Sequence, residues 1–209
     1  MKKILISIIL LASLPLFATA QQITASPLEG RWTWNQKGTD DPGYTELIFF
    51  GNVMLGGFDD DWEYQGNVFT HTGRAITFDD GYTVWQYRVS GSTLTITDED
   101  NVRFTYVRAT TTRSPLEGIW RITGGSVYSP DEAEFFLFTG DILAFGGGSD
   151  YMGGKIIFSG NQFYFAYDYD EDLTAKELEE FAVEYTVRGN TLTIKADDDD
   201  GEITFTKVY

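Results

Sequence analysis

The sequence predicts an all-β protein built from two tandem antiparallel meander β-barrels, with one short helical insertion in the second barrel. Two observations lead to this class. First, the segment SPLEGRWTW at 26–34 recurs as SPLEGIWRI at 114–122. Second, apolar and polar side chains alternate over short segments bounded by turn residues, which is the period of a β-strand. A repeated unit of about eight such strands is typical of a closed meander, which leaves no strand edge exposed.

The similarity between the two halves continues beyond this segment and keeps the same order along the chain. Repetition of this kind indicates two copies of one structural unit, each with its own hydrophobic core. The matching segments are 49–55 with 138–144, 64–78 with 151–165, 87–97 with 185–195, and 102–108 with 203–209.

A short polar segment, ATTTR at 109–113, separates the two copies and is predicted to be a linker. The first barrel is then predicted at 21–108 and the second at 114–209. Because so short a linker holds its two domains close together, we expect the barrels to touch.

Alternation in one segment of the first copy illustrates the strand pattern. Trp85, Tyr87 and Val89 share one face of the expected strand, and Gln86 and Arg88 share the other. Glycine and asparagine pairs between such segments favour tight turns. In the first copy we expect strands near 30–36, 44–50, 52–58, 61–65, 67–71, 74–78, 82–89, 92–97 and 102–108, two of which could be parts of one long bent strand.

One segment of the second copy, 174–181, favours a helix. Thr174 and Glu177 have the spacing of a capping box, in which each side chain bonds a free backbone N–H at the start of the helix. The first copy has no counterpart of this stretch. We therefore expect a helical insertion between two strands of the second barrel.

The first twenty residues, 1–20, are predicted to be a signal peptide and not part of the fold. Lys2 and Lys3 precede an apolar run at 4–17, and Ala-Thr-Ala at 18–20 offers small residues for cleavage. No second long apolar run follows. We therefore expect an exported protein, periplasmic or secreted, that is not inserted in the membrane after cleavage.

The composition excludes several classes of function. The chain has no cysteine, so it can offer neither a disulfide nor a thiolate nucleophile or ligand. Its net charge is −17, and without Lys2 and Lys3 13 basic residues remain against 32 acidic ones, a charge near −19. A charge of this sign opposes binding to phosphate backbones, so we exclude nucleic acid as a partner. Aromatic residues make up 16% of the chain, and their burial could replace disulfides in holding small domains together.

A Gly-x-Trp motif opens each unit, at 30–32 and at 118–120, and a cation in phase with the inward residues closes it, Arg108 or Lys207. A cation over an inward-facing tryptophan at the closed end of a barrel would contribute about 0.5–2 kcal/mol. Together with the meander, this combination resembles the lipocalin or calycin family. The closest likeness is to the short lipocalin-like domains of exported bacterial proteins, here in tandem.

The resemblance implies a non-enzymatic binding protein with a small apolar or amphipathic ligand at an open barrel end. These units are much shorter than a lipocalin barrel, so aromatic rings could also fill the interior. The alternative is then a protein-interaction or inhibitor module of the cell envelope, which would use its acidic exterior or the groove between the barrels. The residues expected to line the ligand site are Trp34, Trp85 and Tyr87 in the first barrel, and Phe163, Phe165 and Tyr185 in the second.

The sequence also argues against catalysis, and we expect no catalytic residue and no cofactor. His71 is the one histidine of the chain, and its counterpart in the second copy is Phe158, which predicts an apolar or edge site rather than a general base. With one histidine and no cysteine, neither a serine triad nor a histidine-based zinc site has its usual partners.

A calcium-stabilised surface module is the third alternative. Asp168, Asp170, Asp172 and Glu179 occupy positions 1, 3, 5 and 12 of an EF-hand-like loop, and Ca²⁺ prefers carboxylate oxygens. Leu173 stands where that loop requires a glycine for its sharp turn. Calcium therefore stays a possible ligand of this segment.

Overall fold

The computed structural model of the chain shows sixteen β-strands in the residues that it describes, and every pair of neighbouring strands is antiparallel. The predicted all-β class is confirmed. No helix long and apolar enough to cross a membrane occurs in this part of the chain. The described residues are 26–35, 43–58, 63–125, 133–166, 182–195 and 201–209.

Strands β1 to β8 pair in chain order and close on themselves. Each strand pairs with the next, and β8 returns to pair with β1, where Trp32 lies opposite Arg108. The predicted closed antiparallel barrel is therefore confirmed. The segments expected at 61–65 and 67–71 belong to one long strand, β4. The bounds are β1 (Gly30–Trp34), β2 (Glu46–Phe50), β3 (Val53–Gly57), β4 (Glu63–Thr72), β5 (Ala75–Phe78), β6 (Val84–Ser90), β7 (Thr93–Thr97) and β8 (Arg103–Arg108).

Strands β9 to β16 repeat this order of pairing, and β16 returns to β9. Lys207 lies opposite Trp120, as Arg108 lies opposite Trp32. Arg108 therefore corresponds to Lys207, and the predicted match of 102–108 with 203–209 is wrong by two residues. The bounds are β9 (Gly118–Gly125), β10 (Phe135–Thr139), β11 (Ile142–Gly147), β12 (Asp150–Ser159), β13 (Gln162–Phe165), β14 (Val183–Arg188), β15 (Thr191–Lys195) and β16 (Glu202–Lys207).

Three predictions fall on residues outside the described ranges. They are the signal peptide at 1–20, the helical insertion at 174–181 and the calcium ligands between Asp168 and Glu179. The structure therefore leaves each of them a prediction.

The repeated Ser-Pro-Leu-Glu-Gly segment forms a plug at one end of the first barrel. Ser26 Oγ accepts a hydrogen bond from the Leu28 N–H (3.1 Å), and the turn places the Leu28 side chain in the core without any exposed surface. Trp32 Nε1 donates to the Leu28 carbonyl at 2.6 Å. The Arg108 guanidinium lies 4.1 Å from the centroid of the Trp32 ring and donates to the Glu29 carbonyl. Each of these residues therefore helps to close the barrel.

The second barrel has the same plug, built from the second copy of the segment. Ser114 Oγ accepts from the Leu116 N–H (3.0 Å), and Trp120 Nε1 donates to the Leu116 carbonyl (2.7 Å). Lys207 takes the place of the arginine: its Nζ lies 5.4 Å from the centroid of the Trp120 ring and donates to the Glu117 carbonyl. The repetition of the sequence is explained by this repeated closure.

The glycine of the motif is required by the backbone at this point. Gly30 has φ of 121° and Gly118 has φ of 141°, values that residues with a side chain rarely adopt. A Cβ atom at Gly30 would also lie 2.6 Å from Nη1 of Arg108. The glycine therefore lets the chain pass close to the neighbouring strand.

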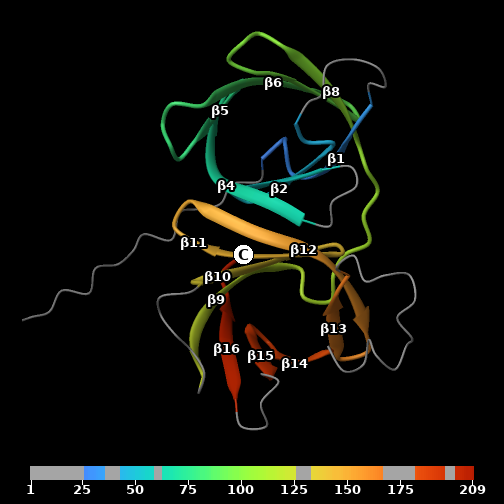
Figure 1. Ribbon diagram of the computed structural model, residues 1–209, viewed down its shortest axis with the longest axis vertical. Helices are drawn as coiled ribbons and strands as arrows, with labels where there is room; N and C mark the ends of the chain where they lie inside the picture. The colour runs from blue at the N-terminus through green and yellow to red at the C-terminus, as the bar shows by residue number, and fades with distance from the viewer. Residues whose placement is uncertain (1–25, 36–42, 59–62, 126–132, 167–181, 196–200) are drawn as a thin grey trace, which may run out of the picture.

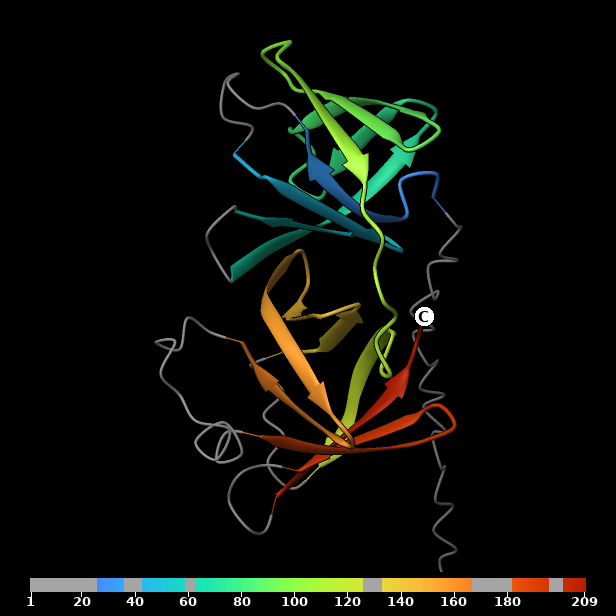
Figure 2. The same cartoon turned by 90° about the vertical axis from the view of Figure 1, so that its right-hand side faces the viewer.

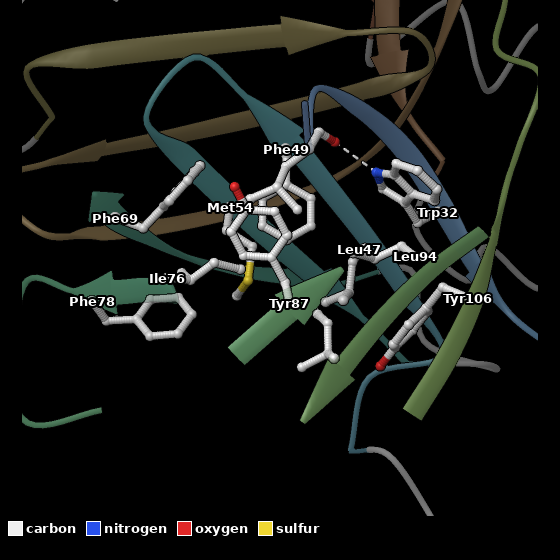
Figure 3. Packing of buried hydrophobic residues seen from close by; sticks show 12 residues of the cluster. Trp32, Leu47, Phe49, Met54, Phe69, Ile76, Phe78, Tyr87, Leu94 and Tyr106 are labelled. Atoms are coloured by element: carbon white, nitrogen blue, oxygen red, sulfur yellow. Dashed lines mark hydrogen bonds between the residues drawn. The ribbon is translucent and has the colours of Figure 1, made fainter. Parts of the chain in front are cut away.

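Side chains fill the interior of the first barrel (Figure 3). Trp32 lies at one side of this core, and its N–H bond is the dashed line in the figure. The Phe49 and Phe69 rings meet edge to face within the same core, with centroids 5.4 Å apart. The side chains that are at most 2% exposed here are Leu28, Trp32, Leu47, Phe49, Met54, Phe69, Ile76, Leu94, Ile96 and Tyr106.

A further apolar core, here named the junction core, lies between the two barrels. Strand β2 turns Leu47 and Phe49 into the first barrel and Ile48 outward, toward the second. Strand β10 likewise turns Phe138 inward and Leu137 outward. These strands are therefore buried on both faces. The junction core contains Ile48, Val53, Leu55, Tyr64, Ile119, Leu137, Ile142, Ala144 and Tyr151.

Hydrogen bonds between β4 and β12 join the two barrels into one continuous sheet (Figure 1). In this seam Tyr64 lies opposite Gly153, and Tyr151 lies opposite Gly66. The two tyrosines are matching positions of the two copies, as are the two glycines, so the seam has approximate two-fold symmetry. The expected contact between the copies is present.

Figure 2 shows the two barrels one above the other, with the segment after β8 running along one side of the junction. The C-terminal residue lies at the same level. Tyr209 packs there against Phe50 of the first barrel, with ring centroids 5.2 Å apart and the planes at 83°. The last residue of the second half therefore also contributes to the junction.

Candidate functional site

Aromatic side chains line the end of the first barrel opposite the plug. Because strand directions alternate, the end of β1 and the starts of β2, β6 and β8 lie at this end. Trp34, Trp85 and Phe104 come from three of these strand ends, and Tyr44 precedes β2. All four are partly buried and pack against the barrel core. These four residues are named the first mouth.

The predicted ligand-binding residues of the first barrel lie at two different depths, two at the mouth and one in the core. Trp34 and Trp85 belong to the first mouth, whereas Tyr87 is only 6% exposed and belongs to the core beneath it. The Tyr87 hydroxyl lies 3.5 Å from Nδ1 of His71, whose ring stacks near Phe69 with centroids 6.2 Å apart. His71 is partly buried between two aromatic rings, and the Tyr87 hydroxyl adds one polar contact to this mainly apolar setting.

The predicted residues of the second barrel are buried more deeply. Phe163 and Tyr185 are 2% and 7% exposed, and Phe165 packs against the same cluster from its edge. Phe158, the counterpart of His71, meets the Tyr185 ring with centroids 6.2 Å apart. These rings form a core cluster, and Phe165 lies nearest to the open end because it ends β13.

The two barrels are alike at the plug and different at the mouth. Where the first barrel has Trp34 and Trp85, strand register and sequence match place Ile122 and Val183 in the second. By the same register, Ile203 corresponds to Phe104. The indoles are therefore a property of the first mouth and are not needed to build this type of barrel.

The indole N–H of Trp34 has an unusual position. Its Nε1 atom is buried, and no hydrogen-bond acceptor pairs with it in the part of the chain that the structure describes. By contrast, the indole N–H of Trp32, at the plug end of the same strand, donates to the Leu28 carbonyl. An unpaired buried N–H costs about 1–3 kcal/mol. Such groups in a folded protein call for an explanation, and a bound acceptor is one.

An ion-pair network crosses the junction beside the junction core. Arg31 Nε lies 2.5 Å from Glu46 Oε1, and Arg31 Nη1 lies 2.6 Å from Oδ1 of Asp141 in the second half. The Tyr64 hydroxyl donates to Glu46 Oε2. The Arg31 and Glu46 side chains are 17% and 14% exposed, so water screens this pair only weakly.

The Arg31 guanidinium of this network and the two phenols of the junction core are not suited to proton transfer near neutral pH. Burial alone would lower the pKa of Arg31, but the hydrogen bond and the charge of Glu46 raise it, so the guanidinium stays charged. Burial and the Glu46 carboxylate raise the pKa of Tyr64, and burial raises the pKa of Tyr151 to about 12. A general acid or base works best with a pKa near the operating pH, so these three groups stabilise the junction and do not transfer protons.

The network can be tested by copying the second half into the first, because positions 31 and 46 correspond to Ile119 and Phe135. Arg31→Ile alone leaves Glu46 without its cation and should lower the free energy of unfolding by about 1–2 kcal/mol. Adding Glu46→Phe restores an apolar pair and should recover part of that loss. Urea unfolding of both single variants and the double variant measures the coupling. Strictly additive effects would contradict a coupled pair.

Two clefts open at the junction. The first has a volume of about 380 Å³ and is lined by seam residues of β4 and β12, among them Gln65 and Met152, which is 66% exposed. The second has a volume of about 430 Å³ and is lined by both halves and the linker, among them Glu29, Arg113 and Tyr209. Both volumes fall in the range of small-molecule sites.

The described residues contain no cluster of metal-ligating side chains. No three histidine or acidic side chains among them come close enough to hold a metal ion together. The predicted calcium ligands Asp168, Asp170, Asp172 and Glu179 lie outside these residues.

The plug and the pairing order of β9 to β16 describe a small closed meander barrel in the second half. Residues 116–209 match the family model of the lipocalin-like domain. The lipocalin-like match begins at Leu116 in the plug and extends to the end of the chain. Barrels of this type are typically binding proteins and not enzymes. The comparison with curated proteins found no match, and neither did the comparison with solved structures.

Sequence reasoning missed the residues of the junction. Arg31 lies on the outward face of a strand, where a charged side chain is expected to meet water. The apolar runs of β2 and β10 did carry a signal, because strands buried on both faces lose the alternation of polar and apolar residues. That signal indicates a second buried face without naming its partner.

Proposed function

We propose that the protein is an exported, non-enzymatic binding protein of two tandem lipocalin-like barrels, 21–108 and 114–209. In this proposal a small apolar or amphipathic ligand binds at the first mouth. The observation that carries the proposal is the buried Trp34 N–H, which has no acceptor among the described residues, in a set of aromatic side chains that the barrel does not need for closure. Small-molecule sites are usually lined by apolar and aromatic side chains with a few polar groups in fixed positions.

The chemistry of the ligand follows from the groups at the mouth. Trp34 offers one donor, so the ligand carries a hydrogen-bond acceptor, such as a carbonyl or ether oxygen. Trp85 and Phe104 offer apolar surface, so the rest of the ligand is apolar or aromatic. Tyr87 supports the site from beneath. Phe163, Phe165 and Tyr185 would form a second aromatic site in the other barrel, where the Tyr185 hydroxyl already donates to the Gly160 carbonyl.

Trp34→Phe tests this proposal, because it removes the N–H and keeps an aromatic ring. With the neutral apolar probe 2-acetylnaphthalene, whose ketone oxygen can accept from the Trp34 N–H and whose rings fit the mouth, we expect saturable binding that quenches tryptophan fluorescence. Trp34→Phe should weaken it about tenfold while the stability stays equal or rises, since the variant has no unpaired donor. Ile122→Val, at the matching position of the second barrel, is the control. Binding that Trp34→Phe leaves unchanged would place the site elsewhere.

The alternative of a protein-interaction module draws support from the filled barrels. Core side chains occupy both interiors, and the two clefts lie at the junction. In that case the probe would not bind at the first mouth, and the exterior of the protein would carry the function.

A further inference from the structure

The second junction cleft is a candidate site that shares no residue with the first mouth. Its wall is apolar: Ile48 is 2% exposed, and the Phe50 and Tyr209 rings meet edge to face beside it. Charged groups surround this wall, and they come from the plug segments, β1, the linker and β16. Which of these charged side chains already has a partner decides which ligand the cleft can bind.

The cations on the inner side of this cleft already have partners. Arg31 uses its guanidinium on Glu46 and Asp141. Lys207 lies over the Trp120 ring and donates to the Glu117 carbonyl. Arg31 is therefore neutralised by carboxylates, whereas Lys207 is held at the indole by neutral partners and keeps its charge.

The two plug glutamates of the cleft differ in how fully they are satisfied. Glu117 accepts hydrogen bonds from the N–H groups of Ser114 (2.8 Å) and Gly140 (3.0 Å) and from the Thr139 hydroxyl (3.2 Å). Glu29 accepts one bond, from the Gly51 N–H at 3.1 Å, and no ion pair joins it to a cation of the described residues.

The surroundings of Glu29 show that its charge is not compensated. Burial raises the pKa of Glu29, the Gly51 N–H lowers it, and the charge of Glu117 raises it further. Tyr209 lines the same cleft, and its pKa is raised by burial and, after that, by the charge of Glu29. A carboxylate in this state gains more from a cation than a hydrated surface carboxylate does.

We infer that the second junction cleft binds small primary ammonium compounds with a short apolar chain. The ammonium group pairs with the free oxygen of Glu29, and the apolar chain lies on Ile48, Phe50 and Tyr209. An ammonium carries three donors, one of which suffices for Glu29, and the aromatic rings add attraction for a cation. Arg113 lies exposed at the rim and repels such a ligand only weakly, because water screens it.

The test uses n-butylammonium chloride as the probe and the amide signal of Gly51 as the reporter, followed by NMR on the full chain. We expect a saturable shift of this signal, since its N–H bonds the Glu29 carboxylate. Glu29→Gln keeps an oxygen that can accept from Gly51 and removes the charge, and it should weaken binding about tenfold. Glu63→Gln, beside the first cleft, is the matched control and should leave binding unchanged.

Three results would overturn the inference. The first is a Gly51 signal that does not move, and the second is equal binding by Glu29→Gln. The third is binding of sodium butyrate as tight as that of butylammonium, because the rim cation Arg113 and not Glu29 would then select the ligand. Should Glu29→Gln fail to fold, Arg113→Gln decides: removing a repelling charge should strengthen butylammonium binding about twofold, and weaker binding would contradict the inference. The first mouth is not involved in any of these outcomes.

Discussion

Trp32→Ala is expected to lower the free energy of unfolding by about 3–5 kcal/mol, the largest effect of any single substitution considered for this chain. The indole is fully buried and is the largest side chain of the plug. Its loss leaves a cavity, takes the donor from the Leu28 carbonyl and removes the ring under the Arg108 guanidinium. Urea unfolding at constant pH measures the change.

Two further variants separate these contributions. Trp32→Phe keeps most of the apolar volume and loses the N–H, so it should cost less than the alanine variant. Tyr82→Ala removes a side chain that is 89% exposed and should change the stability by less than about 0.5 kcal/mol. Because Trp120 holds the same position in the second plug, Trp120→Ala should behave like Trp32→Ala. A loss below about 1 kcal/mol for both tryptophans would show that the plug does not hold the barrels closed.

Gly66→Val is expected to open the seam between β4 and β12 and to destabilise the protein by about 1–3 kcal/mol. A Cβ atom at Gly66 would press on the Leu55 side chain, 2.9 Å from the Met54 carbonyl oxygen and 3.0 Å from Cβ of Tyr151. The backbone of β3 and the strand of the other half cannot move aside without a loss of stability. The seam and the junction core should normally make both halves unfold in a single transition, which this variant should split into two.

Fluorescence can separate the two transitions, because Trp120 is the one tryptophan of the second half. Unfolding followed by calorimetry and by tryptophan emission should coincide for the natural chain and diverge for Gly66→Val. The matched control is Gly124→Val, since no atom lies within 4 Å of a Cβ atom there and the residue is also in a strand. If both valine variants unfold alike, close packing at the seam does not couple the halves.

The barrels could be predicted from the sequence because the patterns that determine them lie within short segments. Alternation sets which residues of a strand face inward, and the repeat of the plug segment fixes where each meander begins and ends. Both features survive in short stretches such as Thr93–Thr97, where Leu94 and Ile96 are buried as the alternation predicts.

The junction could not be predicted because it depends on how two folded surfaces meet. Arg31 and Asp141 are 110 positions apart, and each looks like a surface residue on its own strand or turn. The Trp34 N–H is a further case, since a missing partner is a property of all neighbouring atoms together. The register of the last strands was also misread, because the Phe-Thr dipeptides of β8 and β16 match best when shifted by two residues.

The near symmetry of the seam has a consequence for the order of the two halves in the chain. The barrels are held together by paired strands and a shared core, and the five linker residues are one of two routes that could connect them. The other route runs from Tyr209 to the first plug, and Tyr209 and Glu29 line the same cleft. Chain order is therefore incidental to this architecture: a circular permutant that begins with the second half and ends with the first would meet the same contacts.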